Sequence, residues 1–336
     1  MYTLALAALL LLRITVVHAQ SAATTWRLSP RPVLSLGVQE GKIPEGFGKV
    51  AGALRLGSGA IVVVDGMSLQ VRFFSPQGSP LASSGKSGAG PGEFRTVMSV
   101  RRCAADSVFV YDPALMRISV FTPNVGFARS MDVRTWSTSG LPPYDFWCSE
   151  AGMLAFVHRS SAPPQRVGPR RPDVAITLVA PDSSITHLGM FPASERYFSG
   201  SEDFPRPFGK ETSIAIGLSY VYVGTGEAFE VAKYSLSGRL SGTLREGHTS
   251  MPITSGHVKE YIARQMARRS PMVSAQALER VYQAIEYPVV FPPLCEAASR
   301  RRRQLMDGDV SRPRQTSRMA DLFFGGASDR ADFSTR

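Results

Sequence analysis

The sequence has no glycine period, no heptad and no long apolar run beyond its first residues. The missing repeats exclude a collagen or a coiled coil, and the missing apolar runs exclude a protein with several membrane spans. Because 43% of the 336 residues are hydrophobic, wholesale disorder is excluded as well. Segments with helical spacing are few, whereas 30 glycines and 24 prolines interrupt the chain. This composition predicts an all-β protein with many turns.

Sequence motifs of catalysis are scarce. The four histidines beyond the first 19 residues show no metal-ligand spacing on one element: His158, His187, His248 and His257. The run from Lys86 to Gly90 has the composition of a phosphate loop but lacks the Gly-x4-Gly-Lys-Ser/Thr spacing. No Gly-x-Ser-x-Gly elbow occurs either. Nucleophilic catalysis therefore has no support in the sequence, and no cofactor is expected.

The net charge of +11 does not form a nucleic-acid-binding pattern. Nine arginines and five aspartates lie between Arg300 and Arg336, and the rest of the surplus is scattered. No basic helix with interleaved aromatic residues is present, so no nucleic-acid partner is expected.

The N-terminus has the features of a signal peptide. An apolar run from Leu4 to Leu12 continues after Arg13, and the small residues Val17 and Ala19 suit a signal peptidase. We therefore expect cleavage of residues 1–19 and export to the periplasm or the medium. The alternative, an uncleaved anchor, has too short an apolar run to span a bilayer, so no membrane span is expected in the mature chain.

Two segments 47 residues apart repeat one pattern of short β-branched runs. They are Ala60–Asp65 followed by Leu69–Phe74, and Ser107–Asp112 followed by Arg117–Phe121. Runs of this kind, separated by Gly, Pro and Asn, are typical of four-stranded propeller blades. Further strands are expected at Phe146–Val157, Val174–Val179, Ile185–Gly189, Thr212–Ile216, Leu218–Val223, Ala228–Ser235 and Gly238–Leu244. A strand at Trp26–Leu36 is expected to close the ring.

The connection between the two repeats carries a distinctive motif. Gly88-x-Gly90-Pro91-Gly92-Glu93-Phe94 is followed by strands ending at Asp112 and Phe121. This pattern resembles NHL repeats, and more closely the exported, uncharacterised bacterial six-bladed β-propeller proteins. The resemblance implies an all-β, six-bladed β-propeller over residues 20–293. Glycines there permit a tight crossing with positive φ, and Phe94 is expected to anchor the next strand. The motif indicates an architecture and no particular chemistry.

Two segments depart from the strand pattern. Residues 254–286 have helical spacing, with Thr254 or Ser255 and then Ser274 as N-caps, and predict a helical hairpin packed on the propeller. A lid or a partner-docking hairpin is the alternative. Residues 294–336 form a basic tail instead of a final blade. Reading this stretch one base later forces Met306 and Met319 to Trp and permits strand-like sequence, so an out-of-frame remnant of the last blade is a second hypothesis.

Few residues are candidates for a site. The family resemblance includes metal-dependent propeller enzymes and so implies Asp65 and Asp112 as candidates for a Ca or Zn site, although the third repeat has Val157 at the matching position. An aspartate at a strand end is more often a turn former. Cys103 and Cys148 lie at matching points of consecutive repeats. Export permits a disulfide between them, with two buried free thiols as the alternative.

Three functions remain open at this point. The first is an exported, non-catalytic binding scaffold for a protein, a peptide or a glycan. The second is a metal-dependent propeller hydrolase or lyase with a site in the tunnel. The third, a partly non-functional product, follows from the frameshift hypothesis.

Overall fold

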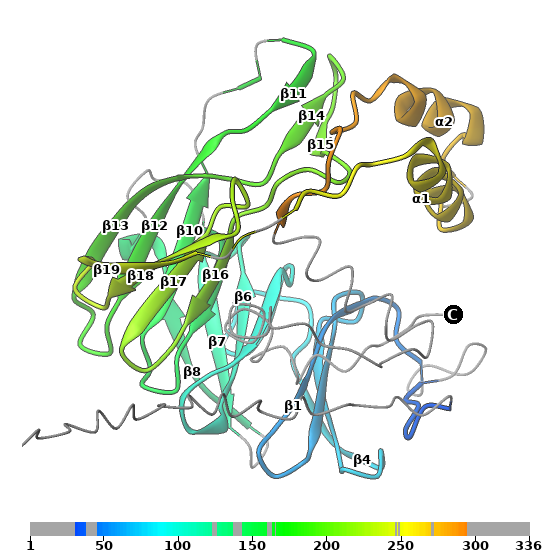
Figure 1. Cartoon of the computed structure of the whole chain (residues 1–336). Helices are drawn as coiled ribbons and strands as arrows, with labels where there is room; N and C mark the ends of the chain where they lie inside the picture. Colours follow the sequence, from blue (N-terminus) through cyan, green and yellow to red (C-terminus); the bar gives the residue numbers. More distant parts are fainter. Residues whose placement is uncertain are drawn as a thin grey trace, which may run out of the picture.

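The protein is mostly β, with five antiparallel sheets of three or four strands and two helices in its described part (Figure 1). The computed structural model describes residues 31–37, 46–122, 126–136, 143–159, 163–164, 166–245, 247, 249–269 and 272–293. The expected signal peptide and basic tail, together with His248 and Cys295, lie outside these residues, so the predictions on them stay predictions.

Four sheets of four strands follow one another along the chain. Sheet 1 contains β1 (Val50–Arg55), β2 (Ile61–Asp65), β3 (Gln70–Phe74) and β4 (Pro80–Ser84). Sheet 2 contains β5 (Ser99–Arg102), β6 (Val108–Asp112), β7 (Arg117–Thr122) and β8 (Gly126–Asp132). Sheet 3 contains β9 (Pro143–Cys148), β10 (Leu154–Arg159), β12 (Asp173–Val179) and β13 (Ile185–Pro192). Sheet 4 contains β16 (Ser213–Ile216), β17 (Tyr220–Gly224), β18 (Glu230–Ser235) and β19 (Leu240–Arg245).

The first strands of these sheets, β1, β5, β9 and β16, lie side by side in that order. Each gap between neighbouring sheets is filled by its own apolar core. The cores centre on Val64 and Phe94 between sheets 1 and 2, on Tyr111 and Phe146 between sheets 2 and 3, and on Ile176 and Val221 between sheets 3 and 4. A single sheet can bury its apolar faces only against neighbouring sheets. A chain that repeats the sheet therefore packs the sheets side by side.

The strand register corrects one alignment made from the sequence. The equivalent turns are closed by the pairs Arg55 with Ile61, Arg102 with Val108, and Cys148 with Leu154. Counting four residues on from the second member of each pair leads to Asp65, Asp112 and His158. The counterpart of the two aspartates is therefore buried His158 and not Val157. By the same count, the position that matches Cys103 is Ser149, and Cys148 is offset from it by one residue.

Two other expectations differ from the structure. Residues 31–37 form no strand, although Leu34 and Leu36 lie against the turn at Gly78, which has a positive φ of 90°. A small sheet, which the sequence did not predict, is formed by β11 (Gly168–Arg170), β14 (Arg196–Phe198) and β15 (Asp203–Pro205). β11 lies between the expected strands Phe146–Val157 and Val174–Val179, where the sequence predicted no strand.

The helical hairpin is present as α1 (Ser255–Ala267) and α2 (Ala275–Ala284), and Thr254 and Ser274 are its N-caps as predicted. Neither helix has a fully buried residue. Phe208, in the chain between β15 and β16, contacts the rings of Tyr261 and Phe291, each with centroids 5.4 Å away. The hairpin therefore packs on the connection beside the small sheet, whereas the sequence predicted packing on the propeller itself.

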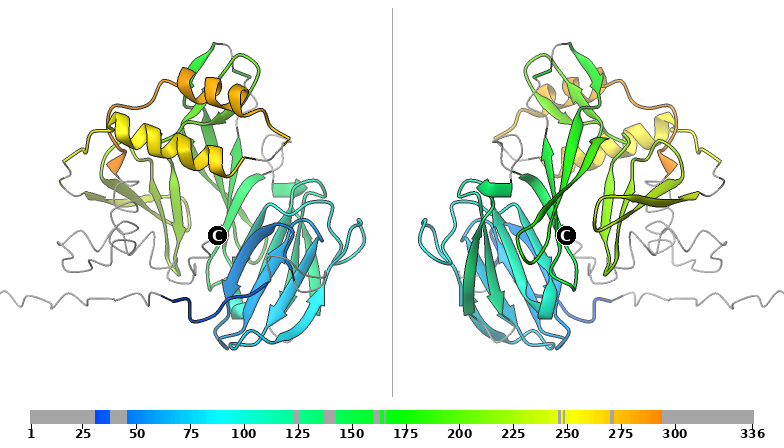
Figure 2. Two further views of the ribbon diagram at one scale, coloured as in Figure 1. Left: turned by 90° about the vertical axis from the view of Figure 1, so that its right-hand side faces the viewer. Right: turned by 90° about the vertical axis from the view of Figure 1, so that its left-hand side faces the viewer.

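Additions to the four sheets gather at one end of the molecule, here called the upper end, where β1, β5, β9 and β16 begin. The small sheet arises from the connections after β10 and β13, and the helical hairpin follows β19, so all of these segments leave from the upper end. Both views in Figure 2 place them there together. At the opposite, lower end, every described turn within the four sheets has five residues or fewer.

Candidate functional site

Asp65 and Asp112 lie at the upper end, where each joins a strand to the preceding connection. Asp65 accepts hydrogen bonds from the backbone N–H groups of Gly48, Lys49 and Met67 and from the Ser68 hydroxyl, at 2.9–3.1 Å. Asp112 accepts from the backbone of Arg95, Thr96 and Leu115 at 2.7–3.2 Å. Both side chains are buried. Each carboxylate therefore ties the chain that enters the first strand of its sheet to the turn between the second and third strands, which is a structural task.

The two carboxylates are not brought together into a metal site. They belong to separate sheets, and His158, which takes the third equivalent position, lies beside Phe156 with ring centroids 6.4 Å apart. In the part of the chain that the structure describes, no group of three or more His, Cys, Asp or Glu is positioned to hold a metal ion. His187 lies 3.5 Å from the Thr177 hydroxyl, and His257 takes part in the capping of α1.

The hydrogen bonds of Asp65 also set its ionisation. Burial alone would raise the pKa of this carboxyl, but the N–H donors of Met67, Lys49 and Gly48 and the Ser68 hydroxyl outweigh burial and lower the pKa below 3.8. A carboxyl whose pKa is lower in the folded than in the unfolded state stabilises the fold fully when the pH lies above its unfolded-state pKa. This stabilisation is lost as the pH falls through the folded-state pKa.

We expect Asp65→Asn to lower the free energy of unfolding by about 2 kcal/mol at neutral pH, because an amide replaces a charged acceptor. The difference from the parent protein should shrink as the pH falls below about 4. Urea unfolding at several pH values measures both effects. Asp173→Asn, at an exposed position, is the control, and a difference that stays constant with pH would contradict this role of the carboxylate.

The glycine motif between sheets 1 and 2 forms a compact crossing. Gly92 has a φ of +72°, and a Cβ there would lie 3.1 Å from the ring of Phe127. Glu93 accepts from the N–H of Gly90 at 2.8 Å and pairs with Lys86. The backbone carbonyls of Ala89, Gly90 and Glu93 accept three hydrogen bonds from the guanidinium of one residue of β7, Arg117.

Phe94 ends this crossing and is fully buried. Its N–H donates to the carbonyl of Lys86 at 2.9 Å, and its carbonyl accepts from Gly88 at 3.0 Å. Pro91 is exposed at the tip. The motif therefore builds the connection between sheets and offers no free group for chemistry.

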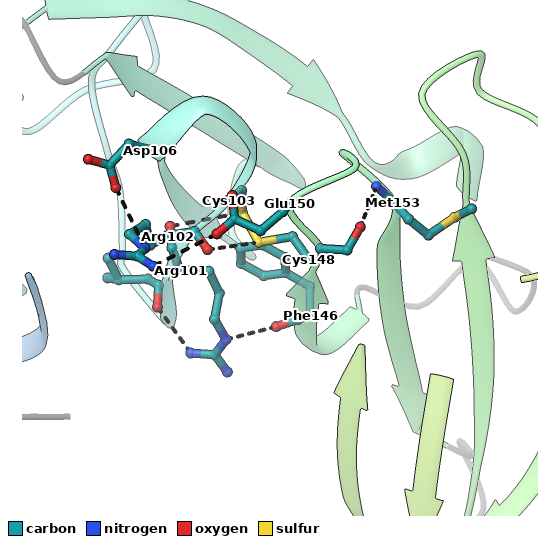
Figure 3. Close-up of a disulfide and its surroundings, with 10 residues drawn as sticks. Arg101, Arg102, Cys103, Asp106, Phe146, Cys148, Glu150 and Met153 are labelled. Atoms are coloured by element: carbon teal, nitrogen blue, oxygen red, sulfur yellow. Dashed lines mark hydrogen bonds and ion pairs between the residues drawn. A yellow bond between two sulfur atoms is a disulfide. The ribbon is translucent and has the colours of Figure 1, made fainter. Parts of the chain in front are cut away.

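A disulfide joins Cys103 to Cys148 at the lower end, with Cα atoms 5.5 Å apart (Figure 3). This distance lies within the reach of a disulfide, and the one-residue offset between the two positions brings the side chains together. Nearer the upper end of the molecule, Arg101 of β5 donates to Asp145 and to the carbonyl of Phe146, both in β9. The disulfide and this ion pair fasten sheets 2 and 3.

The upper end presents residues that the sequence analysis did not select. Tyr144, the second residue of β9, is 41% exposed, and the guanidinium of Arg159 lies 3.8 Å from the centre of its ring. Met67, in the turn between β2 and β3, and Met98, at the entry to sheet 2, are 71% and 47% exposed. No motif marks these side chains, and only the strand register shows that they share one end.

No protein-family model matches the chain, and no curated protein matches it at a significant level. Solved structures with similarity include a Bacteroides fragilis protein described as exported, with a TM-score of 0.35, 11% identity, and coverage of 76% of this chain and 92% of that one. Another is virginiamycin B lyase from Staphylococcus aureus, with a TM-score of 0.32, 11% identity, and coverage of 63% of this chain and 75% of that one.

Within the described residues, no helix is both long enough and apolar enough to cross a bilayer.

Proposed function

We propose that this protein is an exported, non-catalytic scaffold that binds a protein or peptide ligand at its upper end. On this proposal the four sheets are blades of an NHL-like, six-bladed β-propeller. The observation that carries the proposal is the asymmetry of the two ends. The small sheet and the helical hairpin leave from the upper end, whereas the lower turns are short. Binding residues are commonly found on connections held by a rigid scaffold.

Side chains at the upper end support the same proposal. Tyr144, Met67 and Met98 expose apolar surface there, and interfaces favour aromatic residues and methionine. The carboxylates of Asp65 and Asp112 are already used by backbone donors, so the enzyme hypothesis gains no support from them.

Panning a phage-displayed random peptide library against the purified full chain tests this function. We expect enrichment of peptides whose binding is weakened about tenfold or more by Tyr144→Ala, since truncation of a central aromatic residue removes a typical hot spot. The matched control is Leu240→Ala, an exposed apolar residue at the lower end. A library without enrichment, or enriched peptides that depend on Leu240 and not on Tyr144, would overturn the proposal.

A further inference from the structure

At the upper end of sheets 1–3, the described exposed cations outnumber the exposed carboxylates, which are Asp132, paired with Arg134, and Asp173. Lys49, Arg95 and Arg159 are exposed, and none of them forms an ion pair with a carboxylate in the described ranges. The aspartates nearest to two of them, Asp65 and Asp112, are 3% and 0% exposed. Their charge is directed at backbone N–H groups, so these two aspartates do not present their carboxylates to a ligand that approaches from solvent.

The neighbouring upper surface, on the small sheet and beside sheet 4, differs in its charge arrangement. There, five cations contact three carboxylates: Arg170 and Arg196 both contact Asp203, Arg206 contacts Glu195, and Arg171 and Lys210 contact Glu227. Each of these cations has a carboxylate partner. Above sheets 1–3, by contrast, Lys49, Arg95 and Arg159 have no carboxylate within ion-pair distance in the described residues.

An exposed apolar side chain accompanies each of Lys49, Arg95 and Arg159. Met67, in the turn between β2 and β3, lies beside Lys49 at the entry of sheet 1, since the N–H groups of both donate to Asp65. Met98 and Arg95 belong to the connection into β5. Tyr144 and Arg159 are stacked on each other in sheet 3. Because β1, β5 and β9 are neighbours, these three pairs follow one another in the order of the sheets.

We propose that this surface binds an acidic peptide segment that also carries apolar side chains, an inference that rests on the proposed function. Arg95 and Arg159 pair with the carboxylates of the peptide, and Met67, Met98 and Tyr144 contact its apolar residues. Methionine adapts to varied apolar partners, and arginine forms directed hydrogen bonds with carboxylates. The alternation of cations and apolar groups favours a peptide over an acidic glycan, which offers charge without apolar side chains.

The test measures fluorescence anisotropy of a labelled peptide of glutamates with interspersed leucines. Reference peptides have lysine in place of each glutamate, or serine in place of each leucine. We expect the glutamate–leucine peptide to bind tightest. The double variant Arg95→Glu with Arg159→Glu should weaken the affinity for this peptide by about tenfold or more, and the difference from the parent chain should be larger at low salt than at high salt. The charge-matched control is Arg129→Glu with Arg239→Glu, on outer strand β8 and in a lower turn, and it should bind like the parent chain.

Several results would overturn the inference. Equal binding of the lysine peptide would exclude recognition of acidic groups. Tighter binding of the serine reference peptide or of heparin would indicate a polyanion site. Equal losses in the two double variants would indicate unspecific attraction. If library peptides bind through Tyr144 but are not acidic, the scaffold proposal stands and this inference alone fails.

Discussion

Phe94→Ala should lower the free energy of unfolding by about 3–5 kcal/mol, the usual cost of removing a fully buried phenylalanine side chain. Phe94 is 0% exposed and lies in the core between sheets 1 and 2, with its ring centroid 6.1 Å from that of Phe121. The truncation removes the contact that fixes the crossing against both sheets. Urea unfolding followed by near-ultraviolet circular dichroism measures the loss.

The control for this experiment is Leu81→Ala, in edge strand β4. Leu81 is 57% exposed, so its truncation should change the free energy of unfolding by no more than about 0.5 kcal/mol. A cost below about 1 kcal/mol for Phe94→Ala would contradict the burial of its ring and the role of the motif as a structural crossing.

The Cys103–Cys148 disulfide should contribute about 4 kcal/mol, because it closes a loop across a sequence separation of 45 residues in the unfolded chain. The double variant Cys103→Ser with Cys148→Ser should lose about this amount in urea unfolding without reductant. Removing both cysteines together avoids leaving one free thiol in the core.

The third cysteine provides the matched control. Cys295→Ser keeps the disulfide and should unfold like the parent chain. Iodoacetamide labelling in denaturant should modify one cysteine without reductant and three after reduction. Labelling of Cys103 and Cys148 without reductant would contradict the disulfide.

Much of the β structure was predictable because the sequence repeats. The two segments aligned on Asp65 and Asp112 correspond to β2–β3 and β6–β7, and the later runs correspond to strands of sheets 3 and 4. The caps of the helical hairpin were also predictable, since Thr254 and Ser274 each precede an amphipathic segment. Local patterns were enough to predict an element where its apolar residues follow the spacing of a strand or of a helix.

Predictions failed where the result depends on register or on distant packing. The sequence alignment matched Val157 to the aspartates, and the strand pairing moves this match to His158. The small sheet was missed because β11, β14 and β15 have only three residues each and come from two separate connections. No local pattern marks such short strands.

The candidate binding surface was not predictable for a similar reason. Tyr144 and Arg159 lie 15 positions apart along the sequence, and their contact depends on the pairing of β9 with β10. The conspicuous residues of the sequence, Asp65, Asp112 and the glycine motif, instead maintain the scaffold. Side chains that bond to the backbone in equivalent places of each sheet recur in the sequence repeat, whereas residues that contact a ligand need not recur.

Hydrogen exchange of the full chain, with and without a peptide selected from the library, tests the central claim most directly. The proposal predicts slower exchange in the peptide complex at the upper entries, in residues 46–50, 95–99 and 143–145. The lower turns, at residues 56–60, 103–107 and 149–153, should exchange at the same rate with and without the peptide. Protection confined to those lower turns would contradict a ligand site at the upper end.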